Sequence, residues 1–272
     1  MRELLKHPTG AVGVTLLSLV AFATVFGPFL APYDPQQFHP LARLQGPSLA
    51  HWLGTDQFGR DLLSRILVGA RSTILFGLFA TIAGVFAGGA IGLVAGGIGG
   101  VVDNLIMRLL DGLLAVPDLL FTLLIVTVLG GGSGHAMFAV AIAFVPGLAR
   151  ISRSAVLSVR TRDFVTAAYA RGESRGFVIV REIAPNTIAP VIVEASIRVS
   201  FAIMLGATLG FLGLGAQPPS TEWGLMIAEA RQYMFRNPIC VAAPGLAIAL
   251  SALGFNLFGD ALRDLTDPRG RR

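Results

Sequence analysis

The residues that could carry out chemistry in this sequence are few, and they form no catalytic pattern. The chain has no HExxH zinc motif and no GxxxxGK[ST] phosphate-binding loop. The single cysteine, Cys240, has no base near it in sequence, and the four histidines are scattered at His7, His39, His51 and His135. A membrane-embedded enzyme would need a nucleophile with its base or a set of metal ligands, so we expect neither catalysis nor a metal site.

A second group of reactive side chains consists of charges inside apolar segments. Glu194 and Arg198 are four residues apart, and Arg108 and Asp111 are three apart, so each pair could meet on one helical face. Asp118 is the deepest of these charges and has no obvious local partner. Charges in a membrane mark either a transport pathway or pairs that hold helix ends, and both interpretations stay open. The polar residues expected within the membrane are Asp111, Asp118, Glu194, Arg198 and Asn256.

The elements that position these side chains are membrane spans. The sequence is 54% hydrophobic and only 14% charged, whereas a soluble domain has about 25% charged residues. Stretches of about 20 apolar residues are needed to cross a bilayer. Pro32 follows the first apolar stretch and makes a poor cleavage junction, so we interpret this stretch as an uncleaved anchor. The six predicted spans are Ala11–Leu30, Thr73–Ile98, Leu105–Leu129, Met137–Ile151, Ile188–Leu212 and Ile239–Phe258.

The distribution of positive charge predicts which way the chain crosses the membrane. With both termini in the cytoplasm, fourteen Lys and Arg fall in inner segments and six in outer ones. Positive charge favours the cytoplasmic side, so we expect both termini there, and the basic composition does not call for a nucleic-acid partner. The long outer segment 32–71 ends in a stripe of Leu62, Leu63, Ile66 and Leu67, which predicts a helix lying in the outer interface.

Four glycines predict a close contact between two helices. Gly84, Gly88, Gly92 and Gly96 recur every four residues within the second span. Small residues at this spacing form a groove that lets another helix approach closely.

The cytoplasmic stretch 163–190 is charged and helical in pattern. Asp163 could cap a helix whose small face contains Ala167 and Ala168, and Gly172 would end it. We expect Pro185 and Pro190 to stop the next helical turn before the fifth span. A loop that only enforces topology would not need this pattern, so we predict a flat face that docks onto another protein. The alternative is a solvated loop.

Here the sequence resembles a known family. "AAYARG" followed by "IAP", at 167–172 and 183–185, is similar to the coupling-helix motif of ABC importer permeases, although Thr166 replaces its glutamate and Ala184 its leucine. "HWLGTDQFGRDLLSRILVGARSTI" (51–74), "FLGLGAQPPSTEWGLMIAEAR" (211–231) and "FNLFGDALRDLTDPR" (255–269) resemble the C-type membrane subunit of the dipeptide/oligopeptide/nickel branch. The resemblance covers essentially the whole chain.

The resemblance implies an all-α polytopic membrane protein with six transmembrane helices, the type I ABC importer permease fold and a cytoplasmic coupling helix. It implies an anchor and outer segment at 1–71, a permease domain at 72–264 with the coupling helix at about 163–185, and a basic tail at 265–272. The coupling residues would be Phe164, Thr166, Ala167, Ala168, Arg171, Gly172, Ile183 and Pro185. Contacts to an extracytoplasmic binding protein would come from Gln217, Pro218, Pro219, Glu222 and Trp223.

The resemblance also implies a setting and partners. The chain would lie in the bacterial inner membrane with a related B-type permease subunit, two ATPase subunits and a solute-binding protein. It would carry no cofactor itself, since ATP and Mg²⁺ would bind the ATPase subunits, and the solute would be a di- or oligopeptide. The alternative is a proton-coupled secondary transporter that uses Asp118, but such a fold predicts internal repeats, and we find no convincing one in the sequence.

Overall fold

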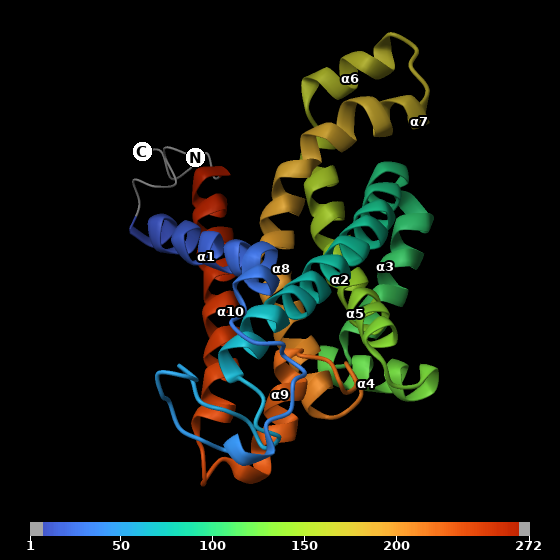
Figure 1. Ribbon diagram of the computed structural model, residues 1–272. Coiled ribbons are helices and arrows are strands. Elements are labelled where there is room, and N and C mark those ends of the chain that lie inside the picture. Colours follow the sequence, from blue (N-terminus) through green and yellow to red (C-terminus); the bar gives the residue numbers. More distant parts are fainter. Residues whose placement is uncertain (1–7, 267–272) are drawn as a thin grey trace.

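A computed structural model describes residues 8–266, and within this range the chain is a bundle of helices (Figure 1). The only β structure in that range is an isolated bridge between Thr55 and Asp61. The α-helices are α1 (Pro8–Leu30), α2 (Leu62–Ile98), α3 (Gly100–Leu114), α4 (Asp118–Leu129), α5 (Ser133–Arg160), α6 (Asp163–Ala170), α7 (Arg175–Phe177), α8 (Ala184–Phe211), α9 (Trp223–Ala230) and α10 (Ile239–Thr266). Two short 3₁₀ segments, η2 (Pro40–Ala42) and η4 (Arg231–Tyr233), and a π-helical segment, η3 (Val178–Ile183), complete them.

Five helical segments within the described range are long and apolar enough to cross a membrane: Thr9–Leu30, Leu62–Ile98, Ser133–Arg160, Arg175–Phe211 and Ile239–Leu265. They match five of the six predicted spans, four of them completely and Ile188–Leu212 up to its last residue. The third predicted span, Leu105–Leu129, falls on α3 and α4, which are long and apolar enough only together and meet at a bend of 90°; counted as one bent span, the pair gives the six spans that were predicted. Pro117 stands at this bend, directly before α4, and proline cannot donate the backbone hydrogen bond that would continue a helix.

The predicted interfacial helix is also wrong as a separate element. α2 runs without a break for 37 residues, and its start is capped by Asp61, whose side chain accepts from the Ser64 amide at 2.8 Å. Leu62 and Arg65 are each 1% exposed, so the first turns of α2 pack inside the protein. The stripe that resembled a membrane-surface helix therefore lies partly in the protein core. The helix also continues without a break across the predicted boundary between residues 71 and 72.

The glycine ladder is a packing seam, as predicted. Gly84, Gly88, Gly92 and Gly96 are all buried and face α5. A Cβ built on Gly92 would lie 2.2 Å from the carbonyl oxygen of Ala149, and one on Gly88 would lie 2.7 Å from that of Val145. The Ser152 hydroxyl donates to the Gly89 carbonyl at 2.9 Å across the same contact. Only glycine permits backbones to approach this closely.

A polar contact between two helices involves a residue expected within the membrane. The Ser200 hydroxyl of α8 donates to the Asn256 amide oxygen of α10 at 2.5 Å. Asn256 is thus a link between two helices, a role that its position within a predicted span did not distinguish from lining a pathway.

The outer segment between α1 and α2 is held by buried ion pairs. Arg60 bonds to Asp56 at 2.6 Å and to Glu229 of α9 at 2.8 Å, and Arg65 approaches the same Glu229 at 3.4 Å. His51 pairs with Asp61 at 2.9 Å. These contacts tie residues 51–65 to α9, so a segment with little regular secondary structure is nevertheless fixed on the bundle.

Candidate functional site: the arm and the intramembrane ion cluster

Residues 161–183, here called the arm, project from the bundle at the end opposite α9 (Figure 1). α5 ends at Arg160, α6 runs outward, and the chain returns through α7 and η3 into α8. Gly172 turns the chain with a φ of +86°, a conformation that favours glycine. Arg162 occupies the N-cap position of α6 and Asp163 lies in its first turn, so the expected cap by Asp163 is wrong by one residue.

The arm has a small hydrophobic core of its own. Val165, Ala168, Val178 and Ile183 pack against Val156 and Val159 of α5. Ala168 and Ile183 are both completely buried. The prediction that Ala168 forms part of a flat docking face is therefore wrong, because this side chain faces inward and its small size lets the two halves of the arm approach each other.

The return half of the arm continues into the next span. Pro185 lies at the start of α8, directly after the π-helical segment η3, and Pro190 lies within α8. Contrary to expectation, neither proline ends the helix before the fifth span. Because Arg175–Phe211 forms one long helical segment with the π-helical turn inside it, the arm is joined directly to a span.

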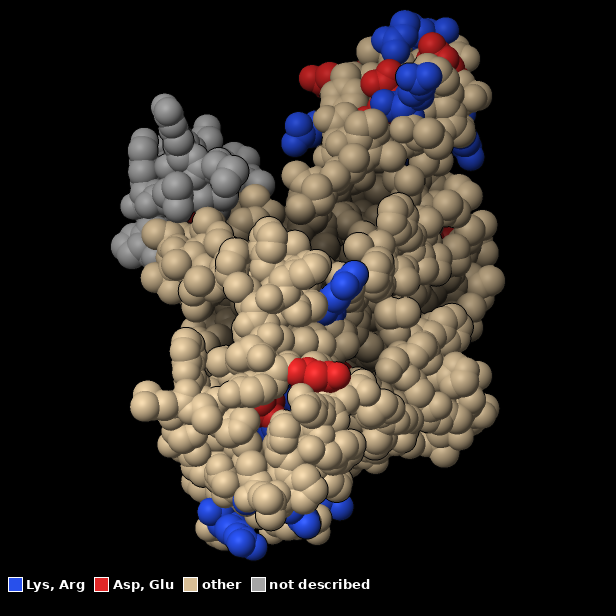
Figure 2. Space-filling model, in the orientation of Figure 1, with Lys and Arg blue, Asp and Glu red and all other residues tan. Residues whose placement is uncertain are grey.

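Other predicted coupling residues do lie on the surface of the arm. The exposed ones are Thr166, Ala167, Arg171 and Gly172, together with Pro185 at the base of the arm. Phe164 is partly buried. Arg171 also pairs with Glu182 at 3.5 Å, which bridges the two halves of the arm. Figure 2 shows most of the charged side chains of this view gathered on the arm.

Sequence reasoning missed three exposed apolar side chains on the arm. Tyr169, Phe177 and Val180 are exposed by 39%, 42% and 64%. Large apolar residues within a charged, water-facing segment were the available signal. Together with the exposed small residues, they give the arm a surface suited to contact with another protein.

Inside the bundle, Glu194 and Arg198 of α8 form an ion cluster with Asp118, which is far from them in the sequence. The Nε of Arg198 donates to Glu194 at 2.9 Å, which confirms the pairing expected within α8. Nη1 of Arg198 lies 3.8 Å from a carboxylate oxygen of Asp118 at the start of α4. The Arg198 guanidinium also lies 5.2 Å from the ring centroid of Phe144. Asp118 therefore has a partner, on another helix.

In the second expected pair, Asp111 has a different partner from the expected Arg108. Asp111 forms an ion pair with Arg150 of α5 instead of Arg108 on its own helix. One turn further along α5, Arg153 donates two hydrogen bonds, of 2.5 and 2.7 Å, to the carboxylate of Asp103. Both contacts link α3 to α5, which explains why a local spacing rule did not find them.

The outer residues predicted to contact a binding protein divide into two groups. Gln217, Pro218 and Pro219 are exposed. Glu222 and Trp223 are 7% and 3% exposed, so their predicted surface role is wrong. Glu222 caps α9 by accepting from two backbone amides at 2.8 Å, and burial raises the pKa of its carboxyl group despite these bonds. The Trp223 indole donates to the Ile66 carbonyl at 3.1 Å.

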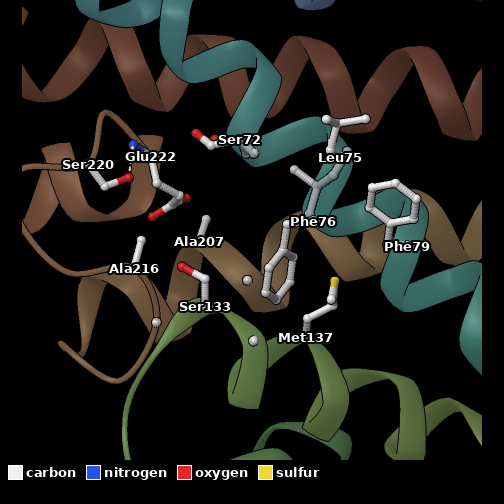
Figure 3. Close-up of a pocket in the computed structure, with 15 residues that line it drawn as sticks. Ser72, Leu75, Phe76, Phe79, Ser133, Met137, Ala207, Ala216, Ser220 and Glu222 are labelled. Carbon is white, nitrogen blue, oxygen red and sulfur yellow. Dashed lines mark hydrogen bonds between the residues drawn. The ribbon is translucent and has the colours of Figure 1, made fainter.

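A cavity of about 200 Å³ lies beside Glu222, between α2, α5, α8 and the loop that precedes α9. In Figure 3 the rings of Phe76 and Phe79 and the Met137 side chain line one part of it, while Ser133 and Glu222 lie at another. Mostly apolar walls with a few polar groups are typical of cavities that accept an apolar group.

The long apolar helices, the glycine seam and the protruding arm define a membrane-spanning transport subunit with the type I ABC importer permease fold. An inward-facing structure of the MetNI methionine ABC transporter has the same fold, with a TM-score of 0.60 at 16% identity over 74% of this chain and 96% of that one. The chain belongs to the family of binding-protein-dependent transport system inner membrane components, whose model matches residues 88–272. Residues 1–47 match the N-terminal TM domain of oligopeptide transport permease C.

Full-length relatives support the same assignment. The chain is 42% identical to the dipeptide transport system permease protein DppC of Alkalihalophilus pseudofirmus, over 98% of this chain and 88% of that protein. It is 43% identical to the probable D,D-dipeptide transport system permease protein DdpC of Escherichia coli K12, over 96% and 88%. The glutathione transport system permease protein GsiD of Pectobacterium atrosepticum is 40% identical, over 98% and 89%. The chain is therefore a permease component of an ABC importer.

Proposed function

We propose that this chain forms half of a translocation pathway for di- or oligopeptides and transmits ATP-driven movement through its arm. The observation that carries the proposal is the continuity of the arm with α8. A partner that pushes on the exposed face of α6 would move α8, because the core of Val165, Ala168, Val178 and Ile183 makes the two halves of the arm one body. Arg198 of the ion cluster would move with that helix.

The partners proposed for this role are a related B-type permease subunit, two ATPase subunits and an extracytoplasmic solute-binding protein. This chain would need no cofactor, and ATP with Mg²⁺ would bind the ATPase subunits. The setting would be the bacterial inner membrane with both termini in the cytoplasm. Two features support this orientation: the inner loops carry the excess of positive charge, and the C-terminal end of α10 points toward the same end as the arm (Figure 1).

The proposed solute class is supported by the relatives and by the chemistry of the bundle. The dipeptide, D,D-dipeptide and glutathione permeases share short peptides as solutes by name. A short peptide carries charged ends and side chains of varied polarity. The partly exposed carboxylate of Asp118 and the apolar cavity beside Phe76 offer complementary surroundings for such groups.

The test is ATP-driven uptake of a labelled dipeptide by the complete complex in proteoliposomes, with two arginine variants. Ala167→Arg adds a charge to the exposed face of α6. Thr161→Arg adds the same side chain at the exposed base of the arm and serves as the control. Ala167→Arg should lose ATPase co-purification or solute-stimulated ATP hydrolysis, while Thr161→Arg keeps both. Normal coupling in Ala167→Arg would refute the docking role of the arm.

A further inference from the structure

Glu222 is a buried carboxylate without a cationic partner. Two other buried acids near this end of the molecule, Asp56 and Asp61, pair with Arg60 and His51 at 2.6 and 2.9 Å. Glu222 is 7% exposed, yet no cation among the described residues forms an ion pair with it. A carboxylate that is buried without a counter-ion costs free energy, and a ligand that brings a positive charge would offset that cost.

The backbone around this carboxylate leaves it room and acceptor capacity. Glu222 accepts from the amides of Gly224 and Leu225 at 2.8 Å each, which uses two of its roughly four acceptor positions. A Cβ on Gly210 of α8 would overlap Oε2 of Glu222, so the glycine makes space for the carboxylate there. Burial raises the pKa of this carboxyl group despite the two hydrogen bonds. A neighbouring cation would stabilise its charged form.

The cavity of about 200 Å³ beside Glu222 is polar at one end and apolar at the other. In Figure 3 the hydroxyl of Ser133 points toward the Glu222 end, while the ring of Phe76 and the side chains of Met137 and Phe79 lie farther from it. Aromatic rings attract cations as well as apolar groups. A ligand that fits both ends therefore carries a positive charge next to a small apolar group.

The cavity opens at the surface between α2 and α5. Its lining residues Ser72, Phe79, Ser133 and Gly134 are exposed. A Cβ on Gly134 meets no heavy atom within 4 Å, so the first turn of α5 leaves open space. Since α2 and α5 both begin near this end, the proposed orientation places the opening toward the outer side of the membrane, where a ligand can enter.

The donors around the cavity favour an organic cation over a metal ion. Among the described residues, no three His, Cys, Asp or Glu side chains are grouped so that they could hold a metal, whereas Ca²⁺ takes about six or more oxygen ligands. A primary ammonium has only three hydrogens to donate. The free acceptor positions of Glu222, with a hydroxyl such as that of Ser133, are enough for it.

We propose that this cavity binds a primary ammonium group attached to a small apolar side chain. The ammonium would pair with Glu222, and the apolar group would lie against Phe76, Phe79 and Met137. Two sources have this chemistry: the amino end of a peptide, which rests on the proposed function, and the headgroup of an ethanolamine lipid, which does not.

The test measures binding of leucyl-alanine to the complete transporter, without the solute-binding protein, by saturation-transfer NMR. The nanodiscs consist of phosphatidylglycerol, which has no ammonium group. Glu222→Gln removes the charge but keeps an oxygen that can cap α9. Gly134→Leu fills the opening, and Gly245→Leu is its control, because Gly245 lies within α10 and also has open space. Recovery of the assembled complex checks that each variant folds.

Wild type and Gly245→Leu should bind the dipeptide equally, and Glu222→Gln and Gly134→Leu at least tenfold more weakly. N-acetyl-leucyl-alanine, which lacks the ammonium, should also bind wild type at least tenfold more weakly. Displacement of the dipeptide by phosphatidylethanolamine added to the nanodiscs would support the site and assign it to the lipid headgroup.

Two results would overturn the proposal: no binding of leucyl-alanine to the wild type, or equal binding to wild type and to an assembled Glu222→Gln complex. ATP-driven dipeptide uptake by the wild-type complex is measured separately. Normal uptake alongside either result would leave the proposed function intact. Absence of uptake would refute the proposed function, whereas the ammonium site would still be decided by the binding measurements.

Discussion

Arg198 of α8 and Asp118 of α4 lie 3.8 Å apart although eighty positions separate them in the sequence. Arg198 is held more closely by Glu194, at 2.9 Å, so it does not depend on Asp118 for a counter-ion. Asp118 is 44% exposed at its side chain, and this leaves its carboxylate accessible. A proton-coupled transporter would need a carboxyl group whose protonation drives the transport cycle. The contacts of Asp118 do not give it that role.

Asp118→Asn is therefore expected to support ATP-driven peptide uptake. The asparagine keeps the size of the side chain, and the loss of one partly exposed ion pair costs about 1 kcal/mol or less. Uptake in proteoliposomes supplied with ATP should persist when an uncoupler is added, in wild type and variant alike. Uptake that follows the proton gradient despite ample ATP would support the secondary transporter instead.

The glycine seam provides a test with an internal control. Gly92→Leu should prevent assembly, because a Cβ there would meet the Ala149 carbonyl oxygen at 2.2 Å, whereas at Gly89 a Cβ meets no heavy atom within 4 Å. Gly89→Leu should therefore insert and assemble normally. Overpacking a helix contact costs about 1–3 kcal/mol or more. Recovery of the assembled complex in detergent measures both variants, and equal recovery would show that the seam tolerates side chains.

How much the sequence could predict depends on whether a feature is local. The apolar length of five spans and the four-residue spacing of Gly84–Gly96 lie within single segments, and both predictions are confirmed. The bend at Pro117 was missed because the apolar run continues across it. A proline inside a span does not by itself predict a bend of 90°, since Pro146 and Pro190 lie within continuous helices.

Features that require two segments were predicted poorly. The pairing of Asp111 with Arg150, and the burial of Glu222 and Trp223, depend on how helices pack against each other. Ala168 shows the same limit within the arm: a small residue fits both a docking face and a tight core, and only the position of η3 decides between them. A helical pattern identified the arm, but not which of its faces lies outward.

The topology predicts which positions react with an impermeant thiol reagent added outside. In a Cys240→Ser background, cysteines at Gln45 and Ser220 should be labelled in intact cells, and one at Thr161 only after the membrane is permeabilised. Gln45 and Thr161 are both exposed, so a difference between them reports sidedness instead of burial. If only the cysteine at position 161 were labelled in intact cells, the topology would be the reverse of the predicted one.

Gly172→Ala should loosen the arm without a steric clash. The position has a φ of +86° and open space around it, so the cost comes from the backbone and is about 1–2 kcal/mol. Gly176→Ala is the matched control, because it also has open space, lies within α7 and has no positive φ. Faster hydrogen exchange of the arm amides is expected in Gly172→Ala only. Equal exchange in both variants would mean that the turn is not under conformational constraint.

Ala167→Arg and Ala168→Arg place the same side chain at neighbouring positions, one exposed and one fully buried. At Ala168 the arginine would enter the core between α6, η3 and α5, and an unpaired buried charge costs about 3–5 kcal/mol. Ala168→Arg should therefore unfold the arm while the spans stay inserted, and Ala167→Arg should leave the arm folded. Limited trypsin digestion in proteoliposomes measures this, because Arg171 and Arg175 lie in the arm. Cleavage there should be at least tenfold faster in Ala168→Arg than in Ala167→Arg. Equal, slow cleavage would show that Ala168 faces outward after all and restore it to the docking surface.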